Sequence, residues 1–191
     1  MRIVVGIAGS TGVIYGIRLL EILRAIPDVE THLIMSNAAK QIVAIETDCS
    51  VEQVEALADK VYRFSDIAAP ISSGSFKTHG MVVIPCSIKT LSGIAHSYDD
   101  NLLVRAADVT LKERQRLVLV VRETPLHLGH LRLMTQVTEM GAIVMPPVPA
   151  FYHRPRAIDD IVNQTMDRVL DLLAVEHPDL FKRWTGPQKQ D

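Results

Sequence analysis

The chain has little cysteine, little net charge and no long apolar run, and each shortage excludes a class of protein. Its two cysteines, Cys49 and Cys86, lack CxxC spacing, which favours reduced thiols over a disulfide framework. The formal net charge is −2 and the pI about 6.4, so neither nucleic acid nor an anionic membrane is indicated as a partner. No apolar stretch approaches the roughly 20 residues that span a bilayer, and the N-terminus has no signal-peptide pattern. We therefore expect a cytoplasmic protein without a membrane segment.

The glycine-rich turn after the first apolar run also lacks two common nucleotide-binding motifs. Residues 6–12 read Gly-Ile-Ala-Gly-Ser-Thr-Gly, which does not match the GxGxxG spacing, and no Gly-Lys-Ser/Thr follows. The backbone N–H groups and the helix dipole at the start of the next helix favour a phosphate, and Ser10 and Thr11 can add hydrogen bonds. The alternative is a tight turn with a capping hydroxyl.

Apolar runs alternate with helical patterns along most of the chain. This β-α repetition predicts an α/β fold of three layers: a doubly wound parallel sheet, Rossmann-like or flavodoxin-like, with helices on both faces. The expected strands are 3–8, 31–35, 81–85, 117–121 and 142–145, and the expected helices are 13–24, 37–45, 50–58, 88–95, 101–113, 128–140 and 158–173. Without a repeat or linker, residues 1–184 predict one domain, followed by a polar tail at 185–191.

Polar residues follow several of the predicted strands. Five aliphatic residues at 117–121, typical of a strand buried on both faces, end in Arg122 and Glu123. Ser36 follows the second strand, and residues 87–90 (Ser-Ile-Lys-Thr) follow the third. Because the carboxyl ends of parallel strands meet at one edge, these turns predict a mononucleotide crevice there. Taken singly, each serine is explained as a helix cap and the Arg122–Glu123 pair as a solvated ion pair.

The remaining candidates have simple structural alternatives. Residues 145–155 contain four prolines in eleven residues, which would hold Tyr152 in a fixed place or serve as a rigid spacer. Arg168 flanks the apolar face of the last helix and either meets an anion or extends into solvent. Lys112 is by default a solvated cation at a helix end. Cys86 is better explained as a small buried residue than as a nucleophile, and no metal site is expected.

Seven short segments spread over nearly the whole chain form a recognisable set: 9–12 (GSTG), 72–75 (SSGS), 85–91 (PCSIKTL), 105–109 (RAADV), 111–114 (LKER), 122–126 (RETPL) and 146–152 (PPVPAFY). Together they resemble the UbiX-type flavin prenyltransferases and occur in that family's order. The similarity extends more distantly to cysteine-decarboxylating flavoproteins.

This resemblance implies a cytoplasmic enzyme that joins a dimethylallyl group from dimethylallyl monophosphate to reduced FMN, at N5 and C6, without a metal. The product, prenylated FMN, is the cofactor of UbiD-type decarboxylases, in ubiquinone synthesis or in aromatic acid decarboxylation. The resemblance also implies a homo-dodecamer with sites at subunit contacts. The FMN-binding residues implied are Gly9, Ser10, Thr11, Ser36, Ser87, Ile88, Lys89, Thr90 and Arg122.

The resemblance further implies that Tyr152 and Arg168 bind the prenyl phosphate and that Lys112 is a further phosphate ligand. Glu123 and Glu46 match carboxylates that help proton movement. The phosphate-suited groups exceed what one FMN phosphate needs, which favours prenyl transfer over the alternatives. Those alternatives are an FMN-dependent decarboxylase or oxidoreductase, and a non-catalytic subunit that carries flavin to an aromatic acid decarboxylase.

Overall fold

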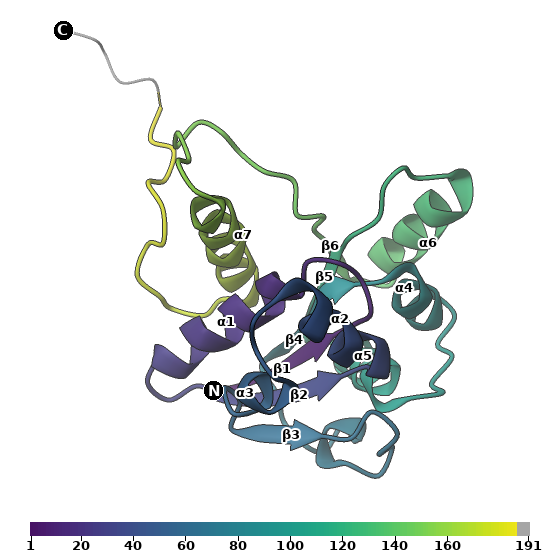
Figure 1. The fold of residues 1–191 in the computed structure, drawn as a ribbon. Coiled ribbons are helices and arrows are strands. Elements are labelled where there is room, and N and C mark those ends of the chain that lie inside the picture. Colours follow the sequence, from purple (N-terminus) through teal and green to yellow (C-terminus); the bar gives the residue numbers. More distant parts are fainter. Residues whose placement is uncertain (187–191) are drawn as a thin grey trace, which may run out of the picture.

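A six-stranded parallel sheet forms the centre of the computed structural model, which describes residues 1–186 (Figure 1). The strand order is β3-β2-β1-β4-β5-β6, so the winding direction reverses between β1 and β4. The predicted doubly wound parallel sheet is therefore confirmed, and ligands of such sheets bind where the order reverses. The strands are β1 (Arg2–Ile7), β2 (Glu30–Met35), β3 (Lys60–Tyr62), β4 (Gly80–Cys86), β5 (Arg116–Val121) and β6 (Ile143–Val144).

Helices cover both faces of the sheet, with α1 and α7 together on one side and α4, α5 and α6 on the other (Figure 1). The α-helices are α1 (Val13–Ala25), α2 (Asn37–Glu46), α3 (Val51–Glu55), α4 (Ile88–Ala95), α5 (Leu102–Lys112), α6 (Leu128–Glu139) and α7 (Ile158–Leu173), and one 3-10 turn, η1, covers Pro70–Ser72. Within the described residues, no helix is long and apolar enough to cross a membrane.

Alternation along the strands divides the core into two halves. Val118 and Val120 of β5 pack on the α1–α7 side, whereas Leu117, Leu119 and Val121 pack on the α4–α5 side. All five are buried. Burial of each aliphatic side chain stabilises the fold by about 1.5–3 kcal/mol. A buried parallel sheet requires apolar residues in both phases, and this explains the continuous run at 117–121.

The structure differs from the sequence prediction mainly at the two sheet edges. Strand β3 was not predicted, because its three residues are exposed or half-buried and carry no apolar alternation. Strand β6 has two residues instead of the expected four, since only Val118 and Leu119 of β5 pair with it. The expected helices agree within a few residues, including α3, where Ser50 and Gln53 form a capping box. Of the expected polar tail, residues 187–191 lie outside the described residues, and the domain boundary at 184 stays a prediction.

Candidate functional site

A cavity of about 930 Å³ lies at the carboxyl edge of the sheet, between the turn after β1, the start of α2 and the start of α4. Its size is within the range of about 300–1,000 Å³ that is common for ligand pockets. As predicted, the polar turns that follow the strands meet at this edge of the sheet, near the point where the strand order reverses. Seven of the predicted site residues line it: Gly9, Ser36, Ser87, Ile88, Lys89, Thr90 and Glu123.

Two of the lining serines also begin helices. The Ser36 hydroxyl accepts a hydrogen bond from the Ala39 N–H at 3.0 Å and caps α2. Ser87 caps α4 by accepting from the Thr90 N–H at 3.3 Å, and its hydroxyl also donates to the Thr90 hydroxyl at 3.1 Å. Capping therefore does not compete with the cavity role, because both serines line the cavity as well.

The turn after β1 is held against the turn after β5. The Ser10 hydroxyl donates to the Arg122 carbonyl at 3.0 Å, and the Arg122 N–H donates to the Cys86 carbonyl at 3.1 Å. Three strand ends (β1, β4 and β5) are thereby joined at one place. Gly9 is in close contact with α2, since a Cβ added there would lie 2.4 Å from the Ala38 Cβ. A side chain at position 9 would displace α2 or fill the cavity.

Glu46, the last residue of α2, reaches the start of α1. Its Oε2 accepts hydrogen bonds from the N–H groups of Gly12 at 2.8 Å and Val13 at 3.3 Å. A carboxylate at this position complements the positive end of the α1 dipole. We expected these N–H groups to favour a phosphate, but Glu46 is their partner in this structure. Thr11, in the same turn, is exposed.

Two ionisable side chains of the cavity carry opposite charge. Glu123 is half-buried, and its Oε1 accepts a hydrogen bond from the Thr124 N–H at 3.0 Å. Lys89 is exposed and forms no ion pair within residues 1–186. The cavity thus offers the ammonium group of Lys89 and the carboxylates of Glu123 and Asp100 beside neutral hydroxyl groups.

Tyr152 lies in a different place from this cavity. It lines a second cavity, of about 440 Å³, together with Arg154, Lys182, Arg183 and Trp184. The proline-rich segment leads from β6 to α7, which packs on α1 (Figure 1). The two cavities share no lining residue.

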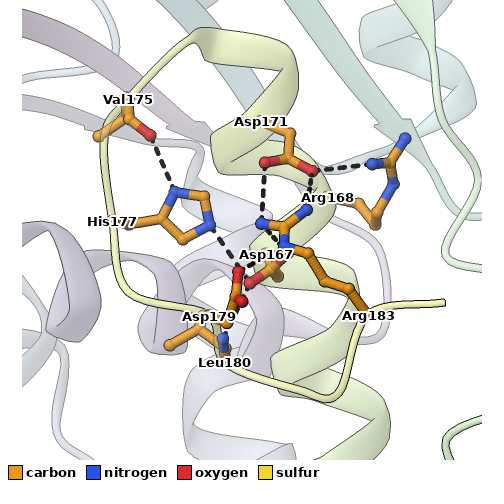
Figure 2. Close-up of polar contacts among 8 residues, drawn as sticks. All are labelled: Asp167, Arg168, Asp171, Val175, His177, Asp179, Leu180 and Arg183. Atoms are coloured by element: carbon orange, nitrogen blue, oxygen red, sulfur yellow. Dashed lines mark hydrogen bonds and ion pairs between the residues drawn. The ribbon is translucent and has the colours of Figure 1, made fainter. Parts of the chain in front are cut away.

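Arg168 lies on α7 and is ion-paired within its own helix. Its Nη1 donates to Oδ2 of Asp171 at 2.8 Å, and the side chain stays 46% exposed (Figure 2). Asp171 also binds Arg183, so Tyr152, Arg168 and Arg183 belong to one region of the surface. An exposed guanidinium is compatible with both alternatives for Arg168, contact with an anion or extension into solvent.

Lys112 is also separate from the cavity within one subunit. Helix α5 starts at the cavity with its cap Asn101 and ends at Lys112, about 16 Å along the helix, where the chain turns into β5. Lys112 forms an ion pair with Glu113 beside Gly74. Only an arrangement that brings subunits together could place Lys112 at the crevice of another copy.

Three further groups have structural explanations. Cys86 is fully buried, and burial raises the pKa of its thiol to about 12, so it is not a nucleophile. His127 caps α6 by accepting from the Gly129 N–H at 3.0 Å, and its ring lies 3.6 Å from that of His130. The burial of Cys86 agrees with the expectation that it is a small buried residue, and the contacts of His127 and His130 are local packing and capping contacts.

One charged network was not predicted from the sequence: it joins Asp167 and Asp171 of α7 with His177 and Arg183 of the segment after it (Figure 2). The one available signal was Asp167, an acidic residue that follows Met166 directly and precedes Leu170 by three positions. Asp167 is completely buried, so it requires charged or hydrogen-bonding partners.

Comparison with known proteins agrees with this geometry. The Flavoprotein family model matches residues 1–173. The flavin prenyltransferase UbiX of Escherichia coli strain K12 is 66% identical over 186 residues, covering 97% of this chain and 98% of the relative.

Two solved structures are similar over nearly their whole length. AnUbiX (PadA1), in complex with FMN and dimethylallyl pyrophosphate, has a TM-score of 0.93 at 50% identity and 98% coverage of both chains. A dodecameric FMN-dependent UbiX-like decarboxylase from Escherichia coli O157:H7 has a TM-score of 0.95 at 52% identity, covering 97% of this chain and 100% of the other. This chain belongs to the flavoprotein family and, within it, to the flavin prenyltransferases of the UbiX type.

Proposed function

We propose that this protein transfers the dimethylallyl group of dimethylallyl monophosphate to reduced FMN, and that FMN binds in the 930 Å³ cavity. The observation that carries this proposal is the pairing of a flavin-sized crevice with a separate cationic and phenolic surface. A relative with 50% identity has been crystallised with FMN and dimethylallyl pyrophosphate together. Family membership over the whole chain supports the same reaction.

The cavity residues fit FMN. Ser87, Thr90 and Lys89 offer hydroxyl and ammonium donors to the oxygen atoms of the ring or phosphate. Gly9 allows α2 to pack closely on the turn after β1, because a Cβ there would meet Ala38. Arg122 follows β5 directly and adds a cation at the same edge. Ser10 and Thr11 complete the turn, although the Ser10 hydroxyl already donates to the Arg122 carbonyl.

The prenyl phosphate is proposed to bind Tyr152 and Arg168, with Lys112 as a further ligand. In one subunit these groups are separate from the flavin cavity. A site shared between subunits of a homo-oligomer resolves this separation. One relative is dodecameric, and we propose the same assembly for this chain.

The reaction breaks the C–O bond of the prenyl phosphate and the π bond of the prenyl group, and it forms two bonds to the flavin. In the first step the C–O bond breaks, inorganic phosphate leaves with the electron pair, and N5 of reduced FMN binds the allylic carbon and loses a proton. In the second step a proton is added to the C2 carbon of the prenyl alkene, C6 attacks the resulting tertiary cation, and C6 loses a proton. Guanidinium, ammonium and phenol groups of Arg168, Lys112 and Tyr152 stabilise the leaving phosphate. A metal ion is not needed for that charge stabilisation.

Two carboxylates are proposed to handle protons. Glu123 lines the flavin cavity and is half-buried, so it can accept a proton during ring closure. Glu46 binds the start of α1 beside the same turn and supports proton movement from there. Apolar walls around the prenyl group keep water from the allylic cation.

The test is anaerobic incubation with reduced FMN and either dimethylallyl monophosphate or dimethylallyl pyrophosphate, followed by the mass of the flavin. We expect the flavin to gain one prenyl unit with the monophosphate, and more slowly or not at all with the pyrophosphate. An unchanged flavin mass, in protein shown to bind both compounds, would refute the transferase. A preference for the pyrophosphate would refute only the proposal that the monophosphate is the donor.

The second candidate function is FMN-dependent decarboxylation or redox chemistry, since one similar structure is described as a decarboxylase. Such an enzyme would regenerate FMN and leave its mass unchanged while substrate is consumed. A non-catalytic flavin carrier would bind FMN and change nothing. We further propose that a UbiD-type decarboxylase in the cytoplasm receives the product. The test is to add such a decarboxylase and to measure whether decarboxylase activity co-purifies with this protein.

A further inference from the structure

Residues 174–186, the C-terminal segment, fold back along α7. The turn starts at Ala174, whose φ is 54° and whose N–H donates to the Asp171 carbonyl at 3.0 Å. The Val175 N–H donates to the Leu170 carbonyl at 3.0 Å, and the Leu180 N–H donates to Oδ1 of Asp167 at 2.9 Å. The segment is therefore attached to α7 through its main chain.

The buried side chain of Asp167 binds the C-terminal segment. Its side chain is fully buried, with Nη2 of Arg183 2.7 Å from Oδ2 and Nε2 of His177 3.3 Å from Oδ1. His177 is itself 3% exposed and its Nδ1 lies 2.8 Å from the Val175 carbonyl. Removing one partner from a buried carboxylate is strongly destabilising, so Arg183 is held firmly.

Arg183 also holds Asp171, and Asp171 holds Arg168. Nη1 and Nη2 of Arg183 donate to Oδ2 and Oδ1 of Asp171 at 2.8 and 3.0 Å (Figure 2). The same Oδ2 accepts from Nη1 of Arg168 at 2.8 Å. The hydrogen bonds of Arg183 keep the pKa of Asp171 below its usual range, so the carboxylate stays charged. Arg168 is thus positioned by a charged group that the C-terminal segment orients.

Tyr152 contacts the same segment. Its ring centroid lies 6.2 Å from that of Phe181 and 5.8 Å from that of Trp184. Of the two side chains proposed to bind the prenyl phosphate, Tyr152 therefore contacts residues 174–186 directly, and Arg168 is linked to them through Asp171.

A metal ion is the alternative explanation of this network. Ligand atoms of Asp167, Asp171 and His177 lie within 4.8 Å of one another. However, Arg183 donates hydrogen bonds to Asp171, and its Nη2 forms an ion pair with Oδ2 of Asp167, so its guanidinium already supplies the positive charge there.

We propose that the C-terminal segment positions the prenyl-phosphate half of the site, with Arg183 and Asp171 as positioning residues for Arg168. This inference rests on the proposed function. Among the described contacts, Arg168 uses Nη1 on Asp171, so its other N–H groups remain available for a phosphate. Bidentate pairing at Arg183 limits the rotation of Asp171 and, through it, of Arg168.

The test compares Arg183→Gln with the unaltered protein in the flavin-mass assay, with each substrate varied in turn. We expect the KM for dimethylallyl monophosphate to rise about tenfold, because a displaced guanidinium forms a poorer charge-assisted hydrogen bond. We expect kcat and the dissociation constant of FMN to stay within about twofold. Asp171→Asn, which keeps the size of the side chain, should raise the same KM if Arg183→Gln proves unstable.

A double-mutant cycle tests whether the effect passes through Arg168. In an Arg168→Ala background, Arg183→Gln should leave kcat/KM for the donor unchanged. Arg18→Gln is the matched control: Arg18 is 39% exposed, binds Asn163 of α7 at 2.8 Å, and lies outside the network. It should alter neither KM.

Three outcomes decide between a positioning and a merely structural role. The proposal is overturned if neither Arg183→Gln nor Asp171→Asn raises the KM for the donor, even where the variants lose kcat or folded protein. An equal effect of Arg183→Gln with and without Arg168 would overturn it too. Absence of prenylation in the unaltered protein would instead reject the proposed function, so the two failures are distinguishable.

Discussion

Two single residues of the cavity, Ser36 and Ser87, each cap a helix and line the cavity at once. The sequence offered these two tasks as alternatives, since a serine after a strand predicts either one. Burial and hydrogen bonding in three dimensions were needed to assign both. The contact of Glu46 with the start of α1 could not be predicted from the sequence, because it joins residues 34 positions apart.

The tight contact at Gly9 leads to a prediction about flavin affinity. Gly9→Ala places a Cβ 2.4 Å from the Ala38 Cβ, so α2 must shift. We expect a loss of about 1–3 kcal/mol in stability and weaker FMN binding. Adding Ala38→Gly removes the clashing methyl group and should restore most of the affinity. Titration of FMN fluorescence measures the affinity, and a double variant as weak as Gly9→Ala would contradict the steric explanation.

The phenol of Tyr152 leads to a prediction about the donor. Tyr152→Phe keeps the ring packing on Trp184 but removes the hydroxyl donor. We expect a rise of about five- to fifteenfold in the KM for dimethylallyl monophosphate, since one hydrogen bond to a charged group is lost. FMN affinity should not change, because Tyr152 lies outside the flavin cavity. Steady-state kinetics with the donor varied would show an unchanged KM if the assignment of Tyr152 is mistaken.

At the scale of helices and strands, periodicity was a good guide wherever an element is buried. The run 117–121 and the amphipathic pattern of α7 gave correct positions. Edge strands β3 and β6 have two or three residues and are exposed or half-buried, so main-chain pairing specifies them instead of apolar residues. The C-terminal segment contains no regular helix or strand, so no periodic pattern predicts its position. Its contacts with the charged residues of α7 form only when the segment folds against that helix.

The connection from α3 into β3 contains an acid-sensitive aspartate. Asp59 accepts hydrogen bonds from the Thr31 N–H at 2.7 Å and hydroxyl at 2.9 Å, which hold its pKa below the usual 3.8. Its contribution to stability is complete above the unfolded pKa and is lost as the pH falls through the lower folded pKa. Urea unfolding between about pH 5 and pH 2 should therefore show a smaller decline for Asp59→Asn than for the unaltered protein.

The control for this pH effect is Asp28→Asn. The Asp28 carboxylate accepts no hydrogen bond from residues 1–186, and its φ of 63° suits asparagine. Its acid dependence should equal that of the unaltered protein. If Asp59→Asn also follows the unaltered protein, the hydrogen bonds to Thr31 do not couple to folding.

At the scale of the whole molecule, the structure places the predicted site residues of one chain in separate regions. The flavin cavity lies at the carboxyl edge of the sheet, where doubly wound folds bind ligands. Tyr152, Arg168 and Lys112 lie elsewhere on the same subunit. The resemblance implied sites at subunit contacts, but a motif carries no information on which copy supplies each residue. The crevice was predictable from topology, whereas the separation of the halves required the structure.

A complementation measurement tests the shared site most directly. Subunits with Glu123→Gln and subunits with Arg168→Ala, carrying different tags, are co-expressed, and mixed oligomers are purified through both tags. We predict that each parent converts little flavin, while mixed oligomers regain prenylation, because some sites combine an intact cavity with an intact Arg168 from a neighbour. Mixed oligomers no more active than their parents would contradict a site shared between subunits.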